Sequence, residues 1–168
     1  MSMTIAQALR RIAKLKGSIG EHYSNAIKSV SYDTTKVPVF SFDDELALMQ
    51  KDQEEMVDLQ TRVAVANANT NLQTADGLTM SLVKAIKSLD EIKGLIKFYT
   101  ILPIRNEKVK EKEQEWNEEK SMYVNITKEV EFVSSLTEKD RTKKVSSLKD
   151  SFEELNNLVE DLNHRTEV

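Results

Sequence analysis

Two histidines and three pairs of adjacent carboxylates are the residues of this chain that could carry out chemistry. A histidine can act as a general base or a metal ligand, and neighbouring carboxylates can share acid–base work. These residues are His22, His164, Asp43–Asp44, Glu118–Glu119 and Glu153–Glu154. Neither histidine has His-x-x-x-His spacing, and the chain has no Gly-x-Ser-x-Gly elbow or phosphate-binding glycine loop. We therefore expect no catalytic residue, no metal and no cofactor. We expect His22 to be a surface or flanking residue of a helix, His164 to be a cation at the negative end of a helix dipole, and the acids to lie in solvent. The expected protein is not an enzyme.

The composition predicts long helices without covalent cross-links. The chain has 168 residues, of which 39% are hydrophobic and 31% charged, with four glycines, two prolines and no cysteine. Few helix-breaking residues favour uninterrupted helices, and the length suits a single domain over residues 1–168. The net charge of −4 disfavours nucleic acid as a partner, because phosphate binding needs a cationic face.

The apolar segments are too short or too charged for export or for crossing a bilayer. Residues 1–11 carry arginines where a signal peptide has its apolar core. The longest nearly apolar run, Leu95–Ile104, is interrupted by Lys97 and has about half of the ~20 residues that a membrane helix needs. We expect a soluble protein that is not secreted by a signal peptide, located in the cytoplasm or in a virion. Membrane binding is disfavoured.

Apolar residues that recur every three or four positions predict four long helices, at residues 4–28, 42–70, 79–102 and 137–163. Ser41, Thr79 and Thr137 stand where N-caps are expected, and Pro103 ends the third helix. The short polar connection 67–77 predicts that the second and third helices form an antiparallel hairpin. The predicted fold is mainly α, an antiparallel bundle of about four long helices with a small β ribbon.

Two segments have β character. Residues 31–40 contain β-branched and aromatic residues with Pro38, and residues 121–134 alternate apolar and polar side chains. We expect an extended ribbon or ordered loop in the first and one or two strands in the second, and the two segments could pair. The charged segment 105–120 between helices is expected to project, either as a solvated helical extension or as a mobile loop.

Two sets of side chains could form an interface. Asn67, Asn69 and Asn71 lie among alanines that allow close approach of another backbone, and their amides could bond across subunits; alternatively they fray the helix into its turn. The second set is apolar and exceeds what four helices need: Leu95, Phe98, Tyr99, Leu102, Leu148, Phe152, Leu155, Val159 and Leu162. The last five follow a coiled-coil spacing that fits packing either on the other helices or on a second copy.

Four short segments give the chain a resemblance to a known family. They are Ala6–Leu9, Asn67–Asn71 with Asp76–Thr79, Glu129–Ser134 and Asn163–Val168. With these the chain resembles the septicolysin-like family of small, poorly characterised bacterial proteins. The resemblance implies a helical fold with a small β element that self-associates, and the family name suggests a cytolysin. Proteins of this kind could also be carried by phages.

Three functions are consistent with these patterns. The leading hypothesis is a non-enzymatic, oligomeric helical protein that serves as a structural or adaptor component of a larger assembly, for example a phage or virion, as a homo-oligomer or with other protein subunits. The alternative is a membrane-active, pore-forming or lysin-like protein that exposes Leu95–Ile104. A third, a hydrolase that uses surface carboxylates, requires a pocket in which acids converge.

Overall fold

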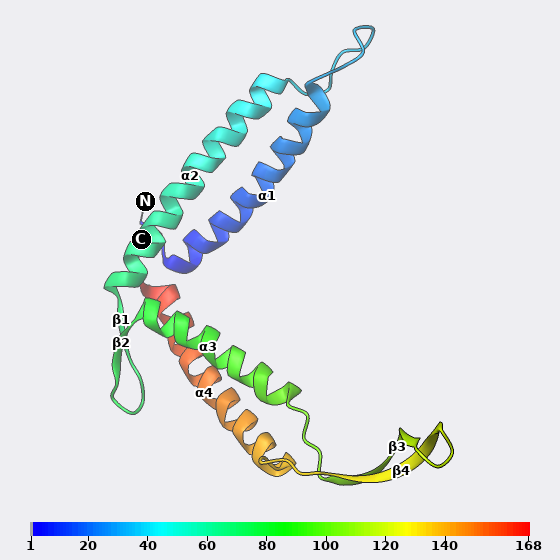
Figure 1. Cartoon of the computed structure of the whole chain (residues 1–168). Coiled ribbons are helices and arrows are strands. Elements are labelled where there is room, and N and C mark those ends of the chain that lie inside the picture. The colour runs from blue at the N-terminus through cyan, green and yellow to red at the C-terminus, as the bar shows by residue number, and fades with distance from the viewer. Residues whose placement is uncertain (1) are drawn as a thin grey trace. The chain divides into compact units, whose positions relative to one another are not determined.

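The computed structural model describes residues 2–168, which are mainly α-helical with two small antiparallel hairpins (Figure 1). The elements are α1 (Ile5–Ser29), α2 (Phe42–Asn69), β1 (Asn71–Gln73), β2 (Thr79–Ser81), α3 (Leu82–Ile101), β3 (Glu107–Asn117), β4 (Met122–Phe132) and α4 (Glu138–Arg165). They fall into a first unit, Met1–Asp90 with Glu153–Val168, and a second unit, Glu91–Phe152. The expected mainly-α class is confirmed, but a single long four-helix bundle is not.

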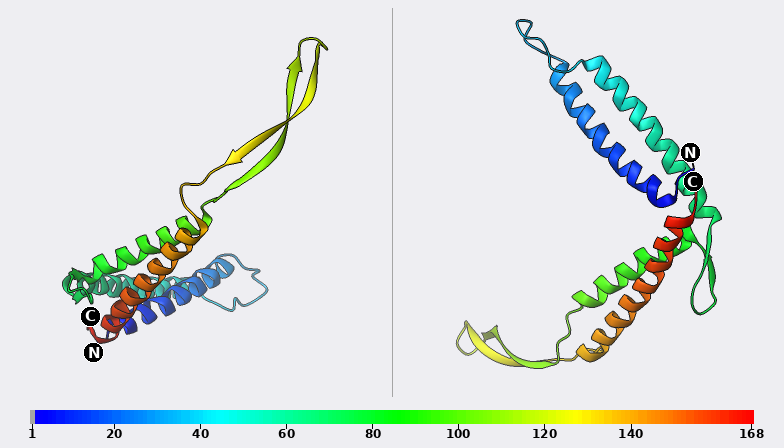
Figure 2. Two further views of the ribbon diagram at one scale, coloured as in Figure 1. Left: turned by 90° about the horizontal axis from the view of Figure 1, so that it is seen from below. Right: turned by 180° about the vertical axis from the view of Figure 1, so that it is seen from behind.

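In the first unit, α1 and α2 pack closely as an antiparallel hairpin (Figures 1 and 2). Thr4 caps α1 in a capping box with Gln7, and the Ser41 hydroxyl accepts a hydrogen bond from the Asp44 N–H at the start of α2. Three acids in the first turn of α2 lie at the positive end of its dipole. Local capping therefore sets where both helices begin; the sequence analysis predicts the Ser41 cap of α2 but not the Thr4 cap of α1.

All the buried hydrophobic side chains that the structure describes belong to the first unit. They come from both hairpin partners and from the adjoining turns of α3 and α4: Ile5, Ala8, Ile12, Leu15, Ala26, Leu59, Val63, Leu72, Leu82, Ala85, Leu89, Leu155 and Val159. Two residues of the predicted C-terminal seam, Leu155 and Val159, are therefore core residues of the chain itself. Burial of this kind contributes roughly 1.5–3 kcal/mol for each large side chain.

The junction between α2 and α3 is repeated by the two ends of the chain. After α2, the Thr70 carbonyl accepts a hydrogen bond of 2.8 Å from the Leu82 N–H, and β1 pairs with β2 so that Asn71 faces Ser81. After α4, the Thr166 carbonyl accepts one of 2.9 Å from the Ile5 N–H, and Glu167 pairs with Thr4 in the same antiparallel sense.

The residues around these two junctions correspond one to one. Thr4 and Ser81 each cap a helix by accepting from the N–H three residues on, and Ile5 and Leu82 are fully buried one residue later. The correspondence continues through buried pairs: Ala8 with Ala85, Ile12 with Leu89, Leu59 with Leu155 and Val63 with Val159. The chain thus contains one helix–strand–strand–helix junction twice, once continuous and once formed by its two ends.

Of the two alternatives for residues 31–40, the structure has the loop and not the ribbon. The Asp33 carboxylate accepts hydrogen bonds from the N–H and hydroxyl of Thr35, which folds part of this segment into a local turn. One expectation for the first unit is wrong. Thr79 does not cap α3, because it lies in β2 and Ser81 is the cap. The sequence prediction missed the β1–β2 hairpin because strands of three residues carry too little alternation to be recognised.

For the second unit, the expectation that residues 105–120 form a helical extension or a mobile loop is wrong. The charged segment forms β3, which pairs along its full length with β4, from Glu107 opposite Phe132 to Asn117 opposite Met122. The strand predicted within 121–134 is confirmed as β4, but it pairs with β3 and not with 31–40. We call this hairpin the β3–β4 ribbon.

Hydrogen bonds at the base of the β3–β4 ribbon hold its two ends together. The Ser134 hydroxyl donates to the Arg105 carbonyl and accepts from the Arg105 N–H, and the Ser134 N–H donates to the Asn106 side chain. The hydroxyl of Thr137 caps α4 by accepting from the Asp140 N–H, as expected.

The repeated junction predicts that the chain tolerates circular permutation. A permutant that joins Val168 to Met1 through a copy of Gln73–Gly77, with new ends between Asp76 and Gly77, should keep the helical circular dichroism and cooperative melting of the parent. Both junction pairings survive in it, and the new ends lie in an exposed turn. A control opened between Gln60 and Thr61, beside the buried Leu59 and Val63, should lose cooperative unfolding. If the permutant opened between Asp76 and Gly77 melted without cooperativity, the two junctions would not be equivalent.

Candidate interaction surface

The second unit has no buried side chain. Across residues 91–152 every side chain is half-buried or exposed, although the segment contains large apolar residues on both helices and on the ribbon. On α3, Phe98 is 51% and Ile101 is 68% exposed. No side chain of this segment is as fully buried as those in the core of the first unit, so burial of apolar surface stabilises it less.

A groove of about 600 Å³ runs between α3 and α4 in the second unit. We call it the α3–α4 groove. Its lining residues are Leu95, Tyr99, Leu136, Asp140, Lys143, Lys144, Ser147 and Leu148. The sequence analysis selected Leu95, Tyr99 and Leu148 as interface residues, and the structure brings them together here. Apolar walls with lysines at the edge suit a partner that is apolar and acidic.

Three contacts made by long charged side chains connect the two helices beside this groove. The Lys144 ammonium lies 5.7 Å from the centre of the Tyr99 ring, and the Lys93 ammonium lies 5.3 Å from that of Phe152. The Arg141 guanidinium donates a hydrogen bond of 3.1 Å to the Leu102 carbonyl. Such contacts contribute about 0.5–1 kcal/mol each at exposed sites, so they leave the groove open to a partner.

The asparagines selected from the sequence are separated by the fold. The Asn67 amide oxygen is buried without a hydrogen-bond partner, whereas Asn71 is exposed in β1. Asn69 lines a separate groove of about 430 Å³ with Arg62 and the C-terminal residues. They do not form one polar cluster.

The sequence analysis did not select Asn163, which repeats Asn67 at the end of α4. Its amide oxygen is also buried without a partner, and it precedes Thr166 by three residues as Asn67 precedes Thr70. The shared Asn-x-x-Thr spacing is the sequence signal that could have found it. Leu162, the last residue of the predicted seam, directly precedes Asn163 and is half-buried.

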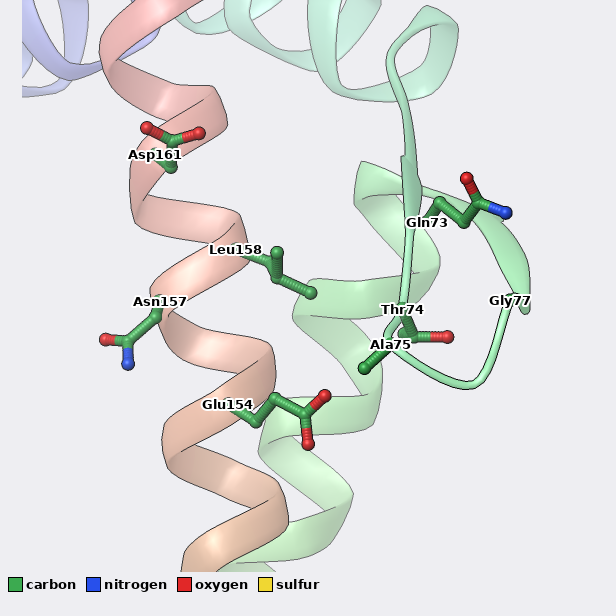
Figure 3. Close-up of a pocket in the computed structure, with 8 residues that line it drawn as sticks. All are labelled: Gln73, Thr74, Ala75, Gly77, Glu154, Asn157, Leu158 and Asp161. Atoms are coloured by element: carbon green, nitrogen blue, oxygen red, sulfur yellow. The ribbon is translucent and has the colours of Figure 1, made fainter.

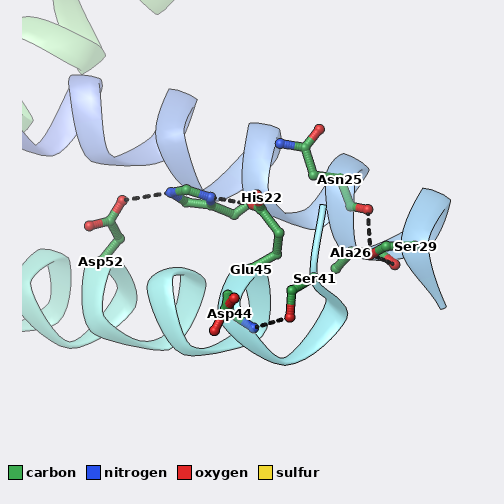
Figure 4. Close-up of polar contacts among 8 residues, drawn as sticks. All are labelled: His22, Asn25, Ala26, Ser29, Ser41, Asp44, Glu45 and Asp52. Carbon is green, nitrogen blue, oxygen red and sulfur yellow. Dashed lines mark hydrogen bonds and ion pairs between the residues drawn. The ribbon is translucent and has the colours of Figure 1, made fainter. Parts of the chain in front are cut away.

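His22 is half-buried at the contact between α1 and α2, which fits the flanking position and not the surface position among the two that the sequence analysis allowed. Its Nδ1 lies 2.6 Å from the Glu45 carboxylate and its Nε2 lies 3.9 Å from Asp52, so the ring sits between α1 and α2 (Figure 4). Glu45 is buried by this contact. The hairpin, which brings positions 22 and 45 together, decides this environment.

A second polar contact joins the same helices near their other end. The Arg11 guanidinium donates two hydrogen bonds, of 2.6 and 2.7 Å, to the Glu55 carboxylate. These bonds lower the pKa of Glu55 and raise that of Arg11. Because both side chains are partly exposed, solvent screens the pair and it adds little to stability. Its main effect is to fix how α1 and α2 align.

An open depression of about 690 Å³ lies where the turn Thr74–Gly77 faces α4 (Figure 3). Glu154 and Asp161 line it, but they are seven residues apart on one helix and so about 10 Å apart along its axis. The third hypothesis requires converging carboxylates, and these two do not converge. Within residues 2–168, no three His, Cys, Asp or Glu side chains cluster where they could hold a metal ion.

The chain matches no protein-family model and no curated protein. Its structure is similar to the crystal structure of a functionally unknown conserved protein from Corynebacterium diphtheriae, with a TM-score of 0.74 and 16% sequence identity. The match covers 100% of this chain and 99% of that chain. At this identity the likeness concerns the fold alone. Among the described residues, no helix combines the length and apolarity needed to cross a membrane.

The buried contact between His22 and Glu45 predicts a measurable loss of stability when the histidine is removed. His22→Ala should lower the free energy of unfolding by about 1–3 kcal/mol, because it leaves the Glu45 carboxylate buried without its partner. Urea denaturation measures the change. Glu21→Ala, at the exposed neighbouring position, is the control and should change the free energy of unfolding by less than about 0.5 kcal/mol. Equal effects of the two substitutions would show that the contact is not stabilising.

Proposed function

We propose that this protein is a non-enzymatic assembly protein that self-associates through its second unit and serves as a structural or adaptor component of a larger particle. The observation that carries the proposal is that no side chain of the second unit is fully buried and that several large apolar ones, such as Phe98 and Ile101, are more than half exposed. Other protein subunits, such as those of a phage or virion, are the expected further partners, and the cytoplasm or a virion is the expected location.

The energetics of isolated elements support this proposal. Helix segments need tertiary packing of an apolar face to be stable in water, and a two-stranded ribbon is marginal by itself. In the second unit both kinds of element present apolar side chains without a core to receive them. A protein partner can supply the missing burial. The exposed Leu95, Phe98 and Ile101 place such a surface on α3.

Self-association predicts a solution mass above that of one chain. Multi-angle light scattering should give a multiple of 19.2 kDa at micromolar concentration. Leu95→Lys with Phe98→Lys should weaken association by at least about tenfold, since each large apolar side chain contributes roughly 1.5–3 kcal/mol on burial. The matched control is Lys97→Gln, a change on the same helix that should leave the mass unchanged. A single-chain mass at every concentration would contradict the proposal.

A second candidate function is membrane activity of the septicolysin-like kind. Its support comes from the loop between α1 and α2, not from the segment Leu95–Ile104 that the sequence analysis selected. The loop between α1 and α2 exposes a group of apolar side chains, with Val37 at 91% and Val39 at 87%. Val30, Tyr32 and Phe40 add to this surface. Exposed apolar loops of this kind can enter the headgroup region of a bilayer. The acids Asp43 and Asp44 nearby disfavour an anionic membrane.

Membrane activity predicts that the protein releases dye from liposomes. At micromolar protein, zwitterionic phosphatidylcholine vesicles should leak, and Val37→Asp with Val39→Asp should abolish the leakage because a charge opposes insertion. Val57→Asp, a half-exposed valine on α2, is the control and should leave leakage intact. Vesicles that stay sealed, both at neutral pH and after mild acidification, would exclude this candidate.

A further inference from the structure

The β3–β4 ribbon has one face that carries most of its apolar side chains; of these, Met122 is 53% exposed and the others are half-buried. Directly paired residues of an antiparallel ribbon share a face, so the register defines both faces. One face carries an apolar row, mostly from β4: Val109, Met122, Val124, Ile126, Val130 and Phe132. Paired residues on the other face are charged or polar, such as Lys108 with Glu131 and Lys110 with Glu129, and end with Trp116 stacked on Tyr123.

The apolar face is also acidic along its β3 edge. Glu107, Glu111, Glu113 and Glu115 lie on this face, against one lysine, Lys128. Glu107 pairs with Arg105 at 3.4 Å and Glu113 with Lys128 at 3.8 Å. No ion pair is formed with Glu111 or Glu115 within residues 2–168. The face therefore combines an apolar row with two carboxylates that a cationic partner could neutralise.

The α3–α4 groove has the complementary chemistry. Its walls are apolar, from Leu95, Tyr99 and Leu148, and its edge carries Lys143 and Lys144 with one acid. The ribbon does not fill the groove of its own chain: within the second unit it runs onward from the ends of α3 and α4 and does not fold back over them (Figures 1 and 2). A second copy of the chain supplies both a groove and a ribbon.

We infer that the β3–β4 ribbon of one copy docks by its apolar, acidic face into the α3–α4 groove of a second copy. This inference rests on the proposed self-association and identifies the surfaces that make it. Reciprocal docking places both ribbons against both grooves in a closed two-fold pair, and it covers Leu95 and Met122, which are exposed, together with the half-buried apolar side chains of both surfaces. Glu111 and Glu115 then lie near the partner's lysines, which fixes the orientation of the ribbon.

A charge exchange tests the contact. One variant carries Glu111→Lys with Glu115→Lys, and the other carries Lys143→Glu with Lys144→Glu. Each should be monomeric alone by light scattering, because like charges meet at both contacts of the pair. Mixed together they should regain the wild-type mass, because each contact then joins opposite charges. Variants that keep the wild-type mass alone, or a mixture that stays monomeric, would overturn the inference.

Disulfide trapping locates the contact independently, since the natural chain has no cysteine. A tagged chain with Ile126→Cys, on the apolar face, is co-expressed with an untagged chain carrying Ser147→Cys in the groove. Oxidation should yield a mixed disulfide at least about tenfold faster than with Lys112→Cys, the control on the opposite face, because docked thiols have a high effective concentration. Equal rates in a chain that is oligomeric by light scattering would overturn the docking but leave the proposed function standing. A wild-type chain that is monomeric throughout would overturn both.

Discussion

The main-chain hydrogen bonds from Leu82 to Thr70 and from Ile5 to Thr166 are the constraint on which the first unit depends. Each bond fixes the start of one helix against the end of another, so Ile5 and Leu82 are fully buried. The apolar stripes of four helices then meet in one place without long loops. The core is therefore a consequence of paired backbone ends, and no single amphipathic helix could have formed it alone.

The two units differ in how the side chains of their helices are packed. In the first unit, small side chains such as Ala8 and Ala85 are fully buried, and leucines and valines fill the core. In the second unit, lysine and arginine side chains connect α3 to α4 beside the α3–α4 groove. The first unit therefore has a fully buried core, whereas the apolar side chains of the second unit are half-buried or exposed.

The polar contacts of the α1–α2 hairpin add specificity to this scaffold. Two polar contacts fix the position of α1 relative to α2 along the helix axes. They join His22 to Glu45 and Asp52, and Arg11 to Glu55. A buried polar contact tolerates fewer alternative registers than an apolar seam does, because an unpaired carboxylate such as Glu45 is costly. These residues therefore account for alignment, and the apolar residues account for most of the stabilisation.

The sequence by itself determined the helices, because stripes at a 3.6-residue period and caps such as Ser41 and Thr137 act locally. It also predicted Leu95, Tyr99 and Leu148 as interface residues, and these three side chains line the α3–α4 groove. Only the tertiary structure decided that the charged segment 105–120 pairs as a strand, because pairing depends on a partner distant along the chain. For the same reason it alone placed His22 beside Glu45 and assigned Leu155 to the core, since both depend on which helices become neighbours.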